Sequence, residues 1–274
     1  MADFKSSVPK TGRVLTDEQT VQIADELAEA TASRSTIPLV SPRFPGMTVE
    51  DSYAIQGLWR QRREDAGGRV VGFKIGLTSH AMQEATGIDE PDYGVIFADQ
   101  LIRSGENVEH ARWSNVRVEV ELAFILKDRL EGTNVTAEDV LAATEVVVPA
   151  LEILDSHIEL SGRTIVDTIA DNAALGAVVI GDREAAPREH DLAWIGATCA
   201  VNGEIIETGV SAGVLGHPAE SAAWLANRFG RHGQAIEAGS LLLAGSFTRP
   251  VWVSPGDTVR AEYQHFGAVE VTFE

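Results

Sequence analysis

Residues 116–126 constrain the fold more than any other segment, because their side chains divide between the two faces of one extended strand. Successive residues of a strand point to opposite sides, so this alternation predicts a β-strand with one apolar face. The chain is therefore expected to contain a β-sheet. One face of the strand would carry Val118, Val120, Leu122 and Phe124, and the other Arg117, Glu119, Glu121 and Ala123.

Short runs of strand-forming residues recur along the rest of the chain. Asn202-Gly203 separates two of them and predicts a type I′ hairpin turn. We expect Pro149 to break the run around it, and the tail to form hairpins around 255–257 and 266–267. Many short strands with few helices between them predict an α+β fold with a mixed, rolled sheet or barrel, not a doubly wound sheet. The expected strands cover residues 69–77, 146–154, 177–180, 195–201, 204–208, 241–246, 251–253 and 259–273.

The first seventy residues are predicted to be helical, because they contain two capping boxes, in which paired side chains satisfy the free N–H groups of a helix start. The chain is therefore expected to comprise a helical N-terminal region, 1–68, and a mixed-β domain, 69–274. Two further helices are expected at 79–86 and 218–229. The capping boxes pair Thr16 with Gln19 and Thr48 with Asp51.

The chain carries a large negative charge, −19, from 22 Lys plus Arg and 41 Asp plus Glu. Such a surface repels nucleic acid and anionic membranes, so neither is expected as a partner. A single cysteine, Cys199, excludes an intramolecular disulfide framework and a thiolate zinc cluster. We find no secretory signal and no apolar stretch that could cross a bilayer, and we expect a cytoplasmic protein.

Three acidic residues on two of the expected strands form the main candidate site. Glu119 and Glu121 stand two apart and therefore point to the same face. Glu152 lies between Leu151 and Ile153, where a charge is costly unless it is paired or binds a cation. If the two strands are neighbours the carboxylates converge, and an all-oxygen site selects a hard cation such as Mg²⁺, Mn²⁺ or Ca²⁺. The alternative is that the first two glutamates belong to the solvated face of an amphipathic sheet.

Lys74 is the second candidate, since it lies between Phe73 and Ile75 in a strand bordered by Gly72 and Gly76. A buried lysine near a cation has a lowered proton affinity, which suits acid–base chemistry. The alternative is a lysine on the outer face of the sheet.

Further charged residues have two interpretations each. Asp89 and Asp92 lie in an acidic segment that is rich in turn residues, and they serve either the turn or a site. Arg163 and Arg249 are rare cations in an acidic chain, and they pair either with a substrate carboxylate or with a surface acid. The sequence contains no zinc-protease, serine-hydrolase or phosphate-loop motif.

Taken together and in this order, several motifs resemble the 2-oxopent-4-enoate hydratase / 4-oxalocrotonate decarboxylase family of the fumarylacetoacetate hydrolase superfamily. The resemblance covers nearly the whole chain and is specific as a set. Within the family it is nearest to the hydratases of 2-oxo-hept-4-ene-1,7-dioate. The motifs are Gly72-Phe-Lys-Ile-Gly-Leu-Thr-Ser79, Gly87-Ile-Asp-Glu-Pro-Asp-Tyr-Gly94, Val118-Glu-Val-Glu-Leu-Ala-Phe124, Val148-Pro-Ala-Leu-Glu-Ile153, Asp171-Asn172, Leu215-Gly-His-Pro218 and Ala244-Gly-Ser-Phe-Thr-Arg-Pro250.

The resemblance implies a rolled mixed β-structure of the fumarylacetoacetase C-terminal type with a helical N-terminal part. It also implies a divalent metal, usually Mg²⁺ with Mn²⁺ as the alternative, and a homo-oligomer that acts on a small 2-oxo acid. The family's active-site lysine falls on Lys74, and its acidic loop residue on Asp92 with Asp89 as the rival. The metal ligands fall on Glu119, Glu121 and Glu152.

The activity that the resemblance implies is metal-dependent hydration of 2-oxo-hept-4-ene-1,7-dioate to 4-hydroxy-2-oxoheptanedioate in aromatic meta-cleavage catabolism. A 4-oxalocrotonate-type decarboxylase is the close alternative, because both chemistries use the same enolate. A C–C bond hydrolase would need an early His–Glu pair, for which His80 and Glu84 are available. A non-catalytic partner subunit of a hydratase/decarboxylase complex is a further alternative, although it would not need to retain the charged set.

Overall fold

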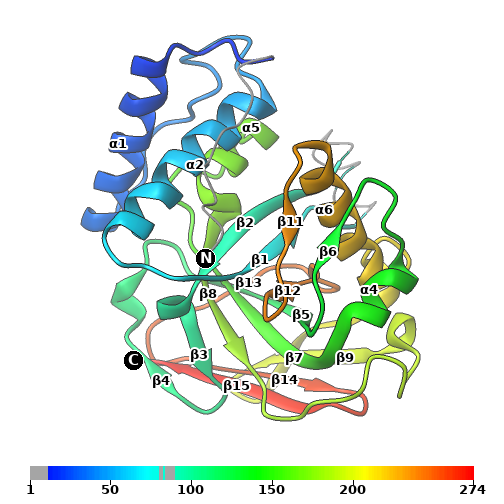
Figure 1. The fold of residues 1–274 in the computed structure, drawn as a ribbon. Helices are drawn as coiled ribbons and strands as arrows, with labels where there is room; N and C mark the ends of the chain where they lie inside the picture. The colour runs from blue at the N-terminus through cyan, green and yellow to red at the C-terminus, as the bar shows by residue number, and fades with distance from the viewer. Residues whose placement is uncertain (1–11, 80–82, 84–89) are drawn as a thin grey trace.

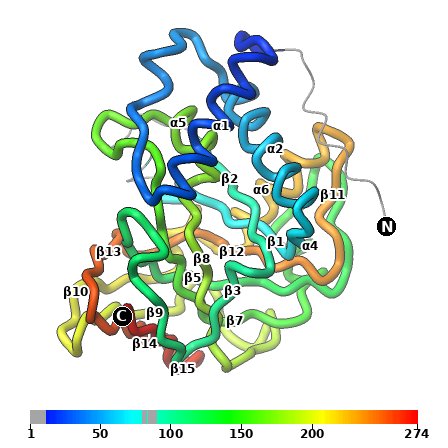
Figure 2. The backbone as a smooth tube through the Cα atoms, turned by 90° about the vertical axis from the view of Figure 1, so that its left-hand side faces the viewer, coloured from blue at the N-terminus to red at the C-terminus, as the bar shows by residue number. Residues whose placement is uncertain are grey.

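The structure is a computed structural model that describes residues 12–79, 83 and 90–274. The helices are α1 (Asp17–Ser33), α2 (Val49–Asp65), α4 (Ala137–Ala143), α5 (Ile165–Ala170) and α6 (Pro218–Arg231). Figures 1 and 2 show α1, α2 and α5 gathered at one end of the molecule, with the β-sheets below them. Among the described residues, no helix combines the length and the hydropathy needed to span a membrane.

The strands form two large sheets and a small ribbon. One sheet has the order β2-β1-β12-β5-β7-β8-β3, with β13 also paired to β5, and the other has the order β10-β9-β14-β15-β4. The strands are β1 (Val70–Gly76), β2 (Asp92–Phe97), β3 (Leu101–Arg103), β4 (Asn107–Val108), β5 (Arg117–Leu126), β6 (Leu130–Glu131), β7 (Thr144–Leu154), β8 (Leu175–Ile180), β9 (Gly196–Val201), β10 (Glu204–Val210), β11 (Ala235–Ile236), β12 (Leu241–Leu243), β13 (Val251–Trp252), β14 (Thr258–Tyr263) and β15 (Gly267–Phe273).

The predicted α+β class is confirmed, and the larger sheet is mixed as expected. Strand β1 runs parallel to β12, and β3 runs parallel to β8, whereas β5 and β7 pair antiparallel at the centre. In the described chain the strand order of each large sheet is open. Of the two predicted alternatives, a rolled sheet and a barrel, the structure therefore does not contain a closed barrel among these strands.

The apolar face of β5 builds the main core. Val118, Val120, Leu122 and Phe124 are fully buried and share one apolar cluster with Val259 and Val271 of the second sheet. The two sheets therefore pack face to face on this side. The opposite face of β5 carries the polar side chains of the candidate site.

The capping boxes at Thr16 and Thr48 are confirmed at the starts of α1 and α2. Helix α2 packs on both α1 and α5, and a second apolar cluster that includes Ile23, Ile55 and Ala170 joins this group. Helices α4 and α5 were not among the expected elements. A threonine–aspartate pair begins each of them as well, Thr136 with Asp139 and Thr164 with Asp167.

The hairpin at Asn202-Gly203 is confirmed, because both residues have the positive φ of a type I′ turn, 52° and 84°. The predicted break at Pro149 is wrong. Strand β7 runs through this residue, whose carbonyl oxygen accepts a hydrogen bond from the N–H of Gly181 at 2.9 Å. Proline removes only its own backbone N–H donor, and the residues on both sides of Pro149 remain paired with β5.

The expected tail hairpin around 255–257 is also wrong in its first strand. Strand β13 pairs with β5, with Trp252 opposite Arg117, and β14 pairs with β9 and β15. Val251 and Val253 thereby reach the main core. The helix predicted at 79–86 and the candidates Asp89, His80 and Glu84 lie outside the described residues, apart from positions 79 and 83 of the helix.

Candidate metal and substrate site

The three predicted glutamates meet on the polar face of β5 and β7. Glu119 lies directly opposite Glu152 across the two strands, and Glu121 follows two residues later on the same side of β5. One carboxylate oxygen from each of the three lies within 4.8 Å of the others. The structure therefore brings Glu152 next to two glutamates that precede it by 33 and 31 residues in the sequence.

Lys74 reaches this group from β1, which lies beyond β12 in the sheet. Its side chain is buried, and Nζ lies 3.2 Å from Oε1 of Glu152. Burial alone would lower the pKa of this lysine, but the surrounding carboxylates, Glu152 and Asp92 foremost, raise it above its ordinary value. The lowered proton affinity expected for Lys74 depends on a neighbouring cation, and these protein groups by themselves have the opposite effect.

Asp92 comes to the same place from β2, where it lies opposite Gly76 of β1. Its carboxyl group is 1% exposed, and among the described residues neither of its oxygens accepts a well-formed hydrogen bond. Burial raises the pKa of Asp92, and Lys74 and Arg163 only partly oppose this effect. A Cβ on Gly76 would lie 2.3 Å from Oδ1 of Asp92, so only glycine leaves room for this approach.

The carboxylates of the acidic cluster repel one another. Burial and the charge of Glu152 raise the pKa of Glu119 to about 7. Burial, Glu152 and Glu119 raise the pKa of Glu121 well above its ordinary value, although the N–H of Gly245 donates to it at 2.6 Å. Such repulsion favours a bound positive charge, and the donor atoms, all carboxylate oxygens, fit a hard divalent cation.

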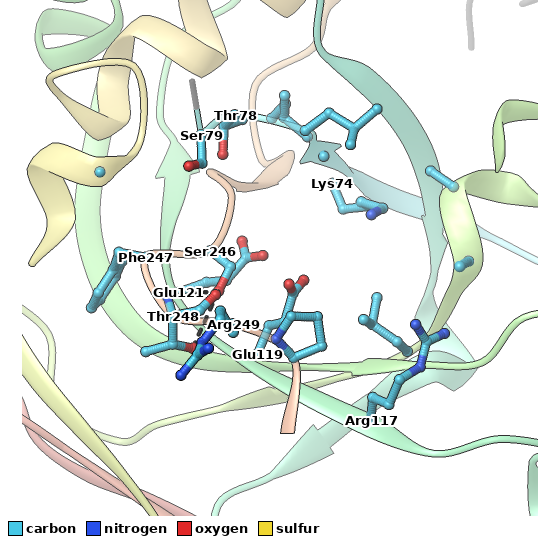
Figure 3. Close-up of a pocket in the computed structure, with 18 of the residues that line it drawn as sticks. Lys74, Thr78, Ser79, Arg117, Glu119, Glu121, Ser246, Phe247, Thr248 and Arg249 are labelled. Atoms are coloured by element: carbon cyan, nitrogen blue, oxygen red, sulfur yellow. Dashed lines mark hydrogen bonds between the residues drawn. The ribbon is translucent and has the colours of Figure 1, made fainter. Parts of the chain in front are cut away.

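The cluster opens into a cavity of about 460 Å³. Figure 3 shows Glu119 and Glu121 rising from β5 toward Lys74, with Thr78 and Ser79 at the top and the 246–249 segment to one side. In this segment the hydroxyl of Ser246 donates to the carbonyl oxygen of Thr248 at 2.9 Å. The cavity combines buried acids and a lysine with room for a small organic molecule.

Arginines line the same cavity. Arg249 is 79% exposed at its side chain and forms an ion pair of 2.7 Å with Glu207, as the surface interpretation expected. Arg163 donates from Nη1 to the hydroxyl of Ser156 at 2.9 Å. Arg117 was not among the expected site residues, although its position two residues before Glu119 places it on the same face of β5.

Asp171 and Asn172, which belong to the recognised motifs, support the structure around the site. Asn172 pairs its side-chain amide with the backbone of Val95 on β2, at 2.8 and 3.1 Å. Asp171 accepts from the ring of His157 at 2.9 Å, and Asp155 binds the other ring nitrogen at 3.2 Å. His157 therefore lies, partly buried, between two carboxylates.

Comparison with known proteins gives one consistent result. The family model "Fumarylacetoacetate (FAA) hydrolase C-terminal" matches residues 69–274. The chain is 43% identical to the 2-oxo-hept-4-ene-1,7-dioate hydratase of Escherichia coli, over 92% of this chain and 96% of that protein. It is 36% identical to a 4-oxalocrotonate decarboxylase of Pseudomonas sp. strain CF600, over 95% and 99%. The structure of the Pseudomonas putida G7 4-oxalocrotonate decarboxylase, complexed with magnesium and adipate, superposes with a TM-score of 0.93 at 35% identity, covering 96% and 100% of the two chains.

Proposed function

Because the chain belongs to the fumarylacetoacetate hydrolase C-terminal family, we propose that it is a metal-dependent hydro-lyase of aromatic meta-cleavage catabolism. Its proposed reaction is the hydration of 2-oxo-hept-4-ene-1,7-dioate to 4-hydroxy-2-oxoheptanedioate. The observation that carries the proposal is the meeting of Glu119, Glu121 and Glu152 beside Lys74 and Asp92. All of these residues except Glu152 line one cavity. The 43% identity to the Escherichia coli dioate hydratase supports the substrate.

The three glutamates would hold Mg²⁺, or Mn²⁺ in its place. When bound, the ion supplies a Lewis acid for the carboxylate and 2-oxygen of a 2-oxo acid. The magnesium in the structurally similar decarboxylase supports this choice, and so do the donor atoms of the cluster.

We propose that Asp92 moves protons and that Lys74 stabilises the negative charge of the enolate. Hydration begins from the dienol tautomer, which takes a proton at C5 and loses the proton of its 2-hydroxyl to give the conjugated 2-oxo-3-ene. Water then adds its hydroxyl at C4, and C3 takes up a proton. Burial favours the neutral acid form of Asp92, so this group is able to deliver a proton from within the cavity. Lys74 keeps its positive charge beside Glu152 and offsets negative charge on the substrate enolate.

Decarboxylation of a 4-oxalocrotonate-type substrate is the second candidate, because the decarboxylase structure superposes so closely. Both reactions stabilise an enolate, so the same five residues serve either one. A non-catalytic role would leave the buried Lys74–Glu152 pair without a purpose. We also propose that the chain works as a cytoplasmic homo-oligomer, which light scattering would test against the 29.4 kDa mass of one chain.

The test is turnover by the purified chain. With Mg²⁺ present, we expect loss of 2-oxo-hept-4-ene-1,7-dioate with formation of the 4-hydroxy product, and no turnover with chelator. Release of CO₂ from 2-oxo-hex-3-enedioate at a higher kcat/KM would instead establish the decarboxylase. Lys74→Met and Asp92→Asn should each lower kcat by about 10²- to 10⁴-fold if Lys74 stabilises the enolate and Asp92 moves protons. Full activity in either variant would refute its assigned role.

A further inference from the structure

We propose that Arg117 and Arg163 form the binding subsite for the distal carboxylate of a dicarboxylic substrate, so that this pair selects dioates over monocarboxylates. The inference rests on the proposed function, because it assumes that the 2-oxo acid end binds at the glutamate cluster. The distal carboxylate would then bind at the other end of the cavity, between Arg117 and Arg163.

The position of Arg117 on β5 fits the length of a seven-carbon dioate. Arg117 precedes Glu119 by two residues on the same face, which separates their Cα atoms by roughly 7 Å along the strand. An extended chain of six bonds, the number between C1 and C7, spans roughly the same distance. In Figure 3 the guanidinium of Arg117 rises on the side of Lys74, away from Arg249.

Arg117 lacks the partners that a buried arginine usually has. It is 7% exposed, its Nε has no hydrogen-bond partner among the described residues, and its Nη2 makes one long contact of 3.4 Å to Oδ1 of Asn115. Its guanidinium lies 5.4 Å from the centre of the Trp252 ring, which supports the plane without neutralising the charge. In the described part of the chain, no carboxylate forms an ion pair with it. A buried charge in this state favours an anionic ligand.

Arg163 supplies a second cation to the same region. It lines the cavity, and its charge acts on both Arg117 and Asp92. Its hydrogen bond goes to the neutral hydroxyl of Ser156, and no described acid forms an ion pair with it. Two cations that repel each other at a cavity wall, in a chain of net charge −19, form a site for a carboxylate rather than for the neutral end of a chain.

Arg249 is the competing candidate and fits less well. Its charge is already neutralised by Glu207, and its side chain is largely in solvent, so a carboxylate would gain little there. Figure 3 places it on the opposite side of Glu119 from Arg117.

The test uses two saturated analogues of equal length, 2-oxoheptanedioate and 2-oxoheptanoate, which differ only at the distal end. Their dissociation constants are measured calorimetrically on the full chain with Mg²⁺. We expect the wild type to bind the dioate more tightly. Arg117→Gln and Arg163→Gln should each weaken dioate binding by about 10- to 100-fold, the usual effect of losing a charge-assisted hydrogen bond, and change binding of the monoacid less than about threefold.

Several outcomes would overturn the inference. An equal loss for both analogues would place Arg117 at the common 2-oxo acid end or in the fold, and a selective loss in Arg249→Gln alone would move the subsite to that residue. Arg117→Lys, which keeps the charge, guards against misfolding and should retain part of the preference. Arg103→Gln, exposed on β3 and outside the cavity, is the matched control. If the wild type binds neither analogue, the proposed function itself fails, whereas binding without a preference refutes the arginine subsite alone.

Discussion

Replacing Glu119 with glutamine should raise stability in the absence of metal and remove most of the stability that the protein gains from bound Mg²⁺. The pKa of Glu119 lies at about 7 instead of 4.5, because of burial and the charge of Glu152. A carboxyl group with a raised pKa in the folded state costs stability once it ionises, so this stability is present below about pH 4.5 and lost as the pH rises through 7.

The size of the effect follows from these values. A difference of about 2.5 between the two pKa values corresponds to roughly 3 kcal/mol, and partial solvent access to Glu119 reduces it to roughly 2–3 kcal/mol. At about pH 8 and without divalent metal, Glu119→Gln should therefore melt about 5 °C above the wild type. Magnesium at 100 times its dissociation constant adds about 2.7 kcal/mol to the wild type, and this gain should be largely absent in the variant.

Thermal unfolding by circular dichroism, in chelator and in Mg²⁺, measures both effects on one sample. Glu204→Gln, which removes the same charge at an exposed site on β10, should leave both melting temperatures near the wild type. The reasoning is refuted if Glu119→Gln melts below the wild type in chelator and keeps the full magnesium shift. A lower melting temperature in chelator alone would refute the charge repulsion at Glu119, and a retained magnesium shift alone would refute its role in binding the metal.

Two further changes test the surroundings of the site. Asp155 and Asp171 outweigh the effect of burial and raise the pKa of His157 to about 10, so its stabilising charge is fully present below about pH 6.5 and lost as the pH rises through 10. Urea unfolding of the wild type should show the free energy of unfolding falling by up to about 1.4 kcal/mol per pH unit between these values. His157→Gln should show no such slope. Gly76→Ala should lower kcat by about 10²-fold because its Cβ would displace Asp92, whereas Gly196→Ala, whose nearest neighbour is 3.8 Å away, should keep wild-type kinetics.

The parts of the fold that the sequence predicted depend on residues within a few positions of one another. The boxes at Thr16 and Thr48, the Asn202-Gly203 turn and the two faces of β5 are all of this kind. The missed α4 starts with a similar pair, Thr136 with Asp139, so its signal was present in the sequence.

The remaining features depend on the order of strands, which no local pattern contains. Lys74 meets Glu152 only because β12 joins β1 to β5 in the sheet. Val251 and Val253 likewise reach the main core only because β13 pairs with β5. The approach of Asp92 likewise depends on its register opposite Gly76. For Arg117, the sequence and the structure each supply one part. Its spacing from Glu119 predicts that it lies on the same face of β5, whereas only the structure shows that its Nε lacks a hydrogen-bond partner among the described residues.

The charges of the cavity also set an order of binding. The carboxylates of Glu119, Glu121 and Glu152 lie around Lys74, so a dianionic substrate that entered first would be repelled by them at its 2-oxo acid end. A divalent cation removes most of that repulsion, while the arginines attract only the far carboxylate. We therefore expect 2-oxoheptanedioate to bind measurably with Mg²⁺ and at least about tenfold more weakly in chelator, with the metal in turn bound more tightly when the dioate is present, as linkage requires. Calorimetry in both orders of addition measures this coupling, and equal dioate affinity with and without Mg²⁺ would show that the glutamates do not bind the ion next to the substrate.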